Sequence, residues 1–149
     1  MNKSNFAGAT PLCPSAQPQM DKSVIFGVIG GTVDVPRVGY LERPQPLTDE
    51  HLSQIGEIAP MEIFRFAATC AGDACMHFDG NDCRLASRIV ELVPIVVDIL
   101  PACQVRSRCR WWLQEGKEAC LRCPQIVTLS QEPSERLRLA ATPNVPEPF

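Results

Sequence analysis

Residues 103–124 read CQVRSRCRWWLQEGKEACLRCP, and residues 70–83 read CAGDACMHFDGNDC. Together the two stretches hold seven of the eight cysteines of the chain, spaced C-x4-C-x7-C-x19-C-x5-C-x10-C-x2-C-P. Cysteines gathered this densely ligate metal, form disulfides or carry redox chemistry themselves. Which of these three kinds of site is present decides how the middle of the chain folds and what the protein does.

The rest of the sequence indicates a cytoplasmic protein, and in that compartment dense cysteines point to metal or redox chemistry rather than structural disulfides. Residues 1–20 lack the apolar segment of a secretory signal. The longest apolar run, residues 89–100, is interrupted by Glu91, Pro94 and Asp98 and is too short to span a bilayer. We therefore expect no membrane partner.

Length and charge narrow the class of protein further. A chain of 149 residues fits one domain, and a net charge of −3 with interleaved acids and bases provides no basic stripe for nucleic acid. Prolines among small polar residues indicate flexible ends. We expect a disordered Pro-rich arm at 1–22, a single Cys-rich globular domain at 23–129 and a flexible Pro-rich tail at 130–149.

The expected fold class is α+β, with a small N-terminal β-hairpin followed by a mostly helical Cys-rich module that binds a metal or cluster. The apolar run 24–29 and its partner 38–41 flank a loop with glycine and proline, which is typical of a hairpin. Thr48 can cap the start of a helix. Residues 61–68 fit either a strand or a helix.

Two helices are expected in the cysteine-bearing part. The first runs from about 83 to 93 and ends at Pro94, because proline disrupts a helix. The second runs from about 105 to 114, and Gly116 follows it as a natural break.

The spacing of Cys109 and Cys120 tests this arrangement. The two residues are eleven positions apart, so one unbroken helix would separate them by about 16 Å, too far to share one metal or cluster. Either the helix breaks at Gly116 and the chain folds back, or the two cysteines serve different centres.

The sharpest local motif is Cys120-Leu-Arg-Cys123-Pro124. Its spacing lets both sulfurs reach one metal or cluster, and a thioredoxin-type catalytic dithiol has the same spacing. A dithiol of that type follows a strand, whereas this motif comes late in a helical stretch. Residues 118–124 resemble the C-x2-C-P segment of the WhiB-like iron–sulfur regulators. The likeness covers seven residues and carries over no regulatory function.

Seven compact cysteines are one donor short of two four-ligand centres. We expect Cys70, Cys75 and Cys83 to anchor one region. The other region is anchored by Cys103, Cys109, Cys120 and Cys123. The missing donor is His77, in the same loop as Cys75, or Cys13 from the N-terminal arm. In a third arrangement one centre has three cysteines and an open iron, which would suit an enzyme.

Iron–sulfur clusters fit the spacing better than zinc does. Structural zinc sites pair two knuckles of closely spaced cysteines, and only Cys120 and Cys123 have that spacing. Apolar and aromatic neighbours can shield a cluster; these are Phe78, Trp111, Trp112 and Leu113. Basic neighbours can stabilise thiolates; these are Arg84, Arg106, Arg108, Arg110 and Arg122.

The sequence therefore predicts an iron–sulfur protein with one or two [4Fe–4S] clusters that transfers electrons to a larger enzyme or assists it. The predicted ligands are the seven compact cysteines, with His77 as a further metal ligand. A zinc-stabilised interaction module without a redox role is one alternative. A small enzyme with an open-coordination cluster is the other, and no catalytic residue is assigned.

Overall fold

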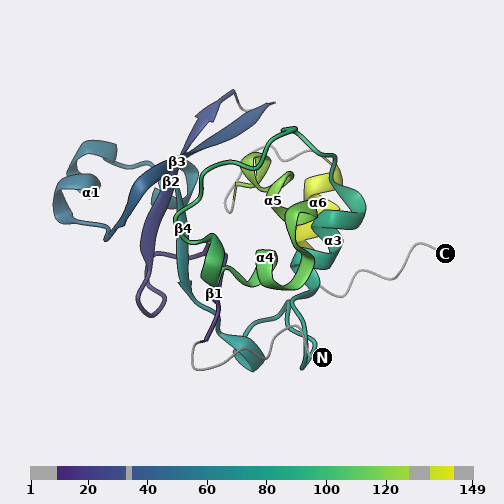
Figure 1. The fold of residues 1–149 in the computed structure, drawn as a ribbon. Helices are drawn as coiled ribbons and strands as arrows, with labels where there is room; N and C mark the ends of the chain where they lie inside the picture. Colours follow the sequence, from purple (N-terminus) through teal and green to yellow (C-terminus); the bar gives the residue numbers. More distant parts are fainter. Residues whose placement is uncertain (1–9, 33–34, 128–134, 143–149) are drawn as a thin grey trace.

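A four-stranded sheet stands beside a group of short helices, and helix α1 projects beyond the sheet (Figure 1). The arrangement comes from a computed structural model that describes residues 10–32, 35–127 and 135–142. It confirms the α+β class. None of the helices in these three ranges has the length and apolar character needed to cross a membrane.

The sheet is antiparallel throughout, in the strand order β1-β4-β2-β3. Its strands are β1 (Leu12–Ala16), β2 (Val24–Gly31), β3 (Pro36–Gln45) and β4 (Phe64–Thr69). The predicted hairpin is confirmed, since β2 pairs with β3 along most of its length. Strand β4, which enters between β1 and β2, is buried along its middle four residues. Both faces of β4 are therefore covered, since Phe66 and Ala68 pack in one core cluster and Ala67 in another.

Strand β1 lies inside the segment expected to be a disordered arm, so that expectation is wrong for Leu12–Ala16. The strand pairs with β4, with Leu12 opposite Thr69 and Cys13 opposite Ala68. Pro14 is compatible with this strand because β1 is at the edge of the sheet, where a missing backbone N–H costs no ladder bond. Alternate residues of β1 are buried, which anchors the arm against the core.

The first helices connect the hairpin to β4. Helix α1 (Asp49–Ile55) begins at Thr48 as expected, and the Thr48 hydroxyl accepts a hydrogen bond from the His51 backbone N–H at 3.2 Å. The ambiguous residues 61–68 divide between the two alternatives. Helix α2 (Pro60–Ile63) occupies the start of that stretch and β4 the remainder. Proline at the first position of α2 favours its single turn.

Helix α3 (Arg84–Leu92) confirms the first expected cysteine-bearing helix. It buries Ile89 and the following Val93 in a core cluster that also contains Ala140 of helix α6 (Glu135–Ala141). Because α6 packs on α3, the expectation of a flexible tail is wrong for this helix. The other residues of the two expected flexible ends that fall in 1–9, 128–134 and 143–149 lie outside the described parts.

The second expected helix, about 105–114, is divided into two pieces, and a third short helix follows the predicted break. A 3₁₀ turn, η2 (Arg106–Arg108), precedes helix α4 (Arg110–Glu115), and helix α5 (Lys117–Cys120) follows Gly116. Gly116 has φ 70° and ψ −150°, a region open almost only to glycine. The helix therefore breaks at Gly116, as one of the two sequence alternatives required, and the chain turns back.

Replacing Gly116 with alanine tests this backbone turn. Gly56, at the end of α1, has φ 63° and ψ −125°, and a Cβ added at either glycine meets nothing within 4 Å. We therefore expect Gly116→Ala and Gly56→Ala each to lower the free energy of unfolding by about 1–3 kcal/mol through backbone strain alone. Urea unfolding of the metal-free protein measures both. An unchanged midpoint for Gly116→Ala would contradict the turn.

Two cysteine sets as candidate metal centres

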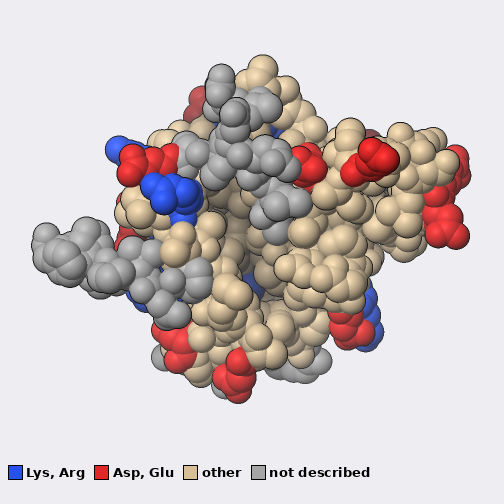
Figure 2. Space-filling view, turned by 180° about the vertical axis from the view of Figure 1, so that it is seen from behind, with Lys and Arg blue, Asp and Glu red and all other residues tan. Residues whose placement is uncertain are grey.

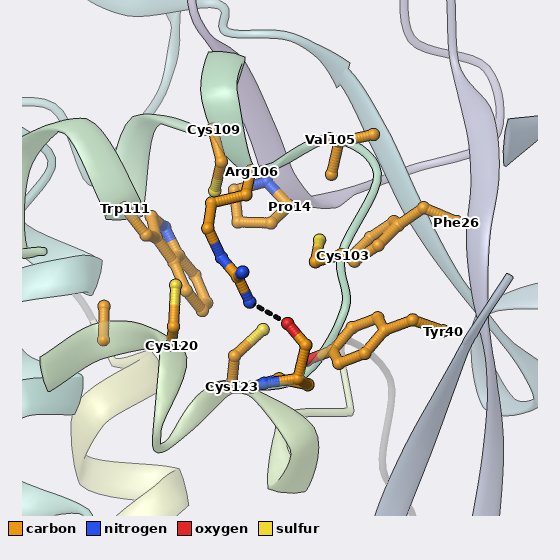
Figure 3. Close-up of a pocket in the computed structure, with 12 residues that line it drawn as sticks. Pro14, Phe26, Tyr40, Cys103, Val105, Arg106, Cys109, Trp111, Cys120 and Cys123 are labelled. Carbon is orange, nitrogen blue, oxygen red and sulfur yellow. Dashed lines mark hydrogen bonds between the residues drawn. The ribbon is translucent and has the colours of Figure 1, made fainter. Parts of the chain in front are cut away.

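The eight cysteines are all free thiols and fall into two sets of four. The C-terminal set lines a single pocket (Figure 3) and contains Cys103, Cys109, Cys120 and Cys123. The N-terminal set contains Cys13, Cys70, Cys75 and Cys83, whose thiolate charges interact with one another. The structure thus brings together the two groups that the spacing predicted, and adds Cys13 to the first.

Each cysteine of the C-terminal set lies where the backbone changes direction. Cys109 ends the turn η2 and caps α4. Cys120 ends α5, and Cys123 begins the 3₁₀ turn η3 (Cys123–Gln125). Short elements joined by tight turns allow four sulfurs from about twenty residues to face one space, which a single long helix would not permit.

The pocket enclosed by the C-terminal set has a largely apolar wall. Apart from the cysteines, its lining residues from the sheet are Pro14 of β1, Phe26 of β2 and Tyr40 of β3. From the helical side come Trp111 of α4 and Ala119 of α5. The cavity enclosed by these residues is small, about 20 Å³, and the Arg106 side chain reaches between the sulfurs (Figure 3). The four sulfurs therefore line one small cavity between the two layers of the fold.

Arg65 of β4 is a fully buried cation against this set. Its guanidinium donates to the Pro14 carbonyl at 2.7 and 3.1 Å, and to the carbonyls of Cys123 and Ile126 at 2.9 and 3.0 Å. It also donates to Cys123 Sγ at 3.4 Å. None of these acceptors is a carboxylate. A buried charge needs an opposite charge, and the partner here that can carry one is the Cys123 sulfur.

The pKa of Arg65 reflects that pairing. Burial alone would lower this pKa, but the negative charges of Cys123 and Tyr40 outweigh burial and raise it. Aromatic rings enclose the guanidinium as well, with its carbon 5.1 Å from the Phe26 centroid and 5.9 Å from that of Trp111. Arg65 is therefore a fixed positive charge that favours anionic sulfur in the pocket.

Arg106 brings a second positive charge, and its side chain reaches between the sulfurs in Figure 3. It is half-buried, donates to the Pro101 carbonyl and lies over Trp112 with its guanidinium carbon 5.5 Å from the ring centroid. Within the part of the chain that the structure describes, Arg106 Nε and Trp111 Nε1 are buried N–H donors without hydrogen-bond partners. Buried N–H donors usually have a hydrogen-bond partner, so an acceptor bound in the pocket would satisfy these two groups.

Three thiols of the C-terminal set, those of Cys103, Cys109 and Cys120, are protonated at neutral pH when no metal is bound. Burial raises the pKa of Cys103, Cys109 and Cys120, and repulsion from neighbouring thiolates raises it further. Arg106 partly counteracts this effect at Cys120. Reactive dithiols have lowered pKa values, so the raised pKa of Cys120 opposes a thioredoxin-type role for this residue.

The N-terminal set is assembled around the β1–β4 edge. Cys13 pairs with Ala68, and the Cys70 backbone N–H donates to the Pro11 carbonyl at 2.9 Å. Burial raises the pKa of Cys13 to about 12, and the charges of Cys83, Cys70 and Cys75 add to the effect. Cys13 was the less favoured of two possible eighth donors, and the structure places it with these three cysteines.

His77, the other possible eighth donor, lies in the same loop but has a different partner. Its Nδ1 is 2.8 Å from Arg88 Nη2, and its backbone N–H donates to Cys75 Sγ at 3.5 Å. Burial, and then the Arg88 charge, lower the pKa of His77. The imidazole is therefore neutral, with Nδ1 directed at Arg88 rather than into the set.

The sulfurs are spaced more widely than a single metal ion requires. In residues 10–32, 35–127 and 135–142, no three His, Cys, Asp or Glu side chains converge closely enough to hold one ion. A tetrahedral zinc site needs four ligands about 2.0–2.3 Å from one ion, whereas a cluster distributes its cysteines over separate irons.

Comparison with protein-family models, curated proteins and solved structures returns no match. The site therefore has to be interpreted from its own residues. Sequence reasoning missed Arg65 and Tyr40. Neither is adjacent to a cysteine in the sequence. Tyr40 lines the pocket and Arg65 contacts Cys123, and both contacts arise because the sheet packs on the helices. Alternation of Arg65 with two phenylalanines was the available signal, but it resembles an ordinary half-exposed strand.

The raised thiol pKa values predict how the stability of the metal-free protein depends on pH. Between about 9, the ordinary value for Cys13, and its folded value of about 12, the folded state holds protons that the unfolded state releases. The free energy of unfolding should therefore fall as the pH rises through this range, and fall less steeply in Cys13→Ser. Urea unfolding at pH 8 to 11 measures it, and stability that rises with pH would refute the assignment.

Proposed function

We propose that the protein is an iron–sulfur protein whose C-terminal set binds a [4Fe–4S] cluster, and that it transfers electrons to a larger enzyme or assists it. The observation that carries this proposal is the convergence of four cysteines on one largely apolar pocket. Four thiolates are the usual ligand set of such a cluster. When bound, the cluster would supply one-electron redox chemistry.

Charge compensation supports a cluster over free thiols. Four protonated thiols would leave the buried Arg65 without a counter-ion, at a large cost in free energy. A cluster bound by four thiolates carries net negative charge, and Cys123 Sγ is already an acceptor of Arg65. The unpartnered N–H groups of Arg106 and Trp111 could donate to a cluster as well.

The wide sulfur spacing supports a cluster over zinc. Zinc would require the four sulfurs to close on one ion, but among the described residues no three candidate ligands lie that close together. A cluster would need only the half-buried Arg106 side chain to turn aside toward Trp112, which it already contacts. Zinc remains the rival that the experiment below distinguishes.

The residues of this chain would shield the cluster and tune its potential. Phe26, Tyr40 and Trp111 limit access of water to the sulfurs. Figure 2 shows acids and bases mostly toward the margins of one face, with acidic side chains gathered at the α1 end. Mixed charge of this kind fits a protein partner better than nucleic acid. Free thiols and cluster chemistry both fit the reducing cytoplasm.

Anaerobic isolation followed by metal analysis tests the proposed function. We expect a brown protein with broad absorption near 400 nm that contains iron and acid-labile sulfide in equal amounts. Cys120→Ser should lose the iron of this centre, because the remaining ligands cannot hold four irons. Gln104→Ala, at an exposed neighbour of Cys103, should retain it. A colourless protein with stoichiometric zinc and no sulfide would refute the proposal.

The position of Arg106 predicts an effect on the reduction potential. Its positive charge next to Cys120 stabilises the more negative reduced cluster. Arg106→Gln should therefore lower the potential by on the order of 50 mV, equivalent to about 1 kcal/mol for a one-electron couple. Arg108→Gln removes the same charge from an exposed position in the same turn and serves as the control. Equal shifts in both variants, measured by protein-film voltammetry, would show that Arg106 has no special role.

A further inference from the structure

We infer that Cys13, Cys70, Cys75 and Cys83 bind a second [4Fe–4S] cluster, with Cys13 as the fourth ligand. This inference rests on the proposed function and goes beyond it, because the C-terminal set alone would suffice for a carrier of one cluster. It identifies which residue supplies the eighth donor that the compact cysteines lack. It also replaces the open iron of the enzyme alternative with full cysteine ligation.

The register of the sheet brings Cys13 and Cys70 to the same face. Cys13 is directly opposite Ala68, and Cys70 is two residues beyond Ala68 along the chain. The Cys70 backbone N–H donates to the Pro11 carbonyl, so the pairing continues to that point. Diagonal neighbours of this kind have Cα atoms about 7–8 Å apart and lie on one face of the sheet. That separation suits ligands of two irons of one cluster.

The loop after Cys70 brings Cys83 back toward the edge of the sheet formed by β1 and β4. Phe78 pairs with Cys83 across the loop, and the Phe78 N–H donates to the Cys75 carbonyl at 3.1 Å. Gln114 of α4 then fixes the Cys83 backbone with two hydrogen bonds, accepting from its N–H at 2.8 Å and donating to its carbonyl at 2.9 Å. The loop is therefore closed at both ends by contacts that do not involve the thiols.

A buried cation without a polar partner accompanies this set as well. Arg110 precedes Gln114 by one helical turn and so lies on the same face of α4. Its guanidinium is 5.2 Å from the Phe78 centroid, in the loop that carries Cys75. Among the described residues, the buried Nε and Nη1 of Arg110 have no hydrogen-bond partner. An anionic centre beside Phe78 would compensate the charge of Arg110, as an anionic Cys123 sulfur would compensate that of Arg65.

Strand β1 separates the two sets, and its alternation explains why Cys13 belongs to the N-terminal one. Pro14 lines the pocket of the C-terminal set, whereas the neighbouring Cys13 points to the opposite side of the strand. Leu12, the residue before Cys13, forms a parallel bridge with Cys109. Strand β1 therefore carries one ligand of the N-terminal set and pairs with one ligand of the C-terminal set. Two clusters would therefore lie close enough together for their unpaired spins to interact.

Iron and sulfide counts with single substitutions test this inference. The wild-type protein, reconstituted anaerobically, should contain about eight irons and eight sulfides per chain, as two full centres require. Cys13→Ser and Cys75→Ser should each lose iron from one cluster only, and Cys75 belongs to the loop rather than to strand β1, so its substitution leaves the strand sequence unchanged. His77→Ala should retain all the iron. The reduced wild type should show electron paramagnetic resonance lines broadened by coupling between clusters, and these lines should sharpen in Cys13→Ser.

The outcomes separate this inference from the proposed function. About four irons in the wild type, lost only on substitution in the C-terminal set, would overturn the second cluster and leave the first intact. Full iron content in Cys13→Ser with loss in His77→Ala would also overturn the inference, because the histidine would then be the ligand. A wild type without iron would refute both. Circular dichroism of the metal-free variants verifies that a loss of iron does not reflect unfolding.

Discussion

The structure depends on one buried guanidinium. Arg65 extends from β4 to the carbonyls of Pro14, Cys123 and Ile126, and so joins the edge strand, the sheet and the last cysteine turn through a single side chain. Charged groups are rarely buried without a partner, because desolvation costs several kcal/mol. The fold therefore has to supply negative charge next to Arg65, and the sulfur of Cys123 is where it can do so. Packing of the two layers and the chemistry of the pocket are linked at this residue.

The number of cysteine ligands and the access to the pocket distinguish an electron carrier from a catalyst. An enzyme with an open-coordination cluster needs an iron without a protein ligand and a route for substrate to reach it. With Cys13 counted, each set offers four cysteines, and the pocket of the C-terminal set is walled by Phe26, Tyr40 and Trp111. Full ligation and limited access favour outer-sphere electron transfer, since an electron needs no vacant coordination position. A partner protein would then approach the margin of the pocket rather than insert a group into it.

Local patterns in the sequence were enough to predict the hairpin, the capped start of α1, the helix α3 and the break at Gly116. Each of these depends on residues close together in the chain, such as Thr48 before its helix. Strand β1 could not be predicted, because Pro14 and its proline-rich surroundings suit a loop and only pairing with β4, about fifty residues later, makes an edge strand of it. The placement of Cys13 beside Cys70 depends on the same pairing. Arg65 was missed because its burial depends on three distant carbonyl groups that no local pattern reveals.

X-ray absorption at the iron and zinc edges of one freshly isolated, anaerobic sample tests the central claim most directly. The account predicts iron with a sulfur-only first shell and a second shell of neighbouring irons, since a cluster places several iron atoms side by side in the pocket. It predicts no stoichiometric zinc. Zinc surrounded by four sulfurs at about 2.3 Å, with no metal neighbour, would contradict it. That result would identify the cysteine sets as structural zinc sites and the protein as an interaction module.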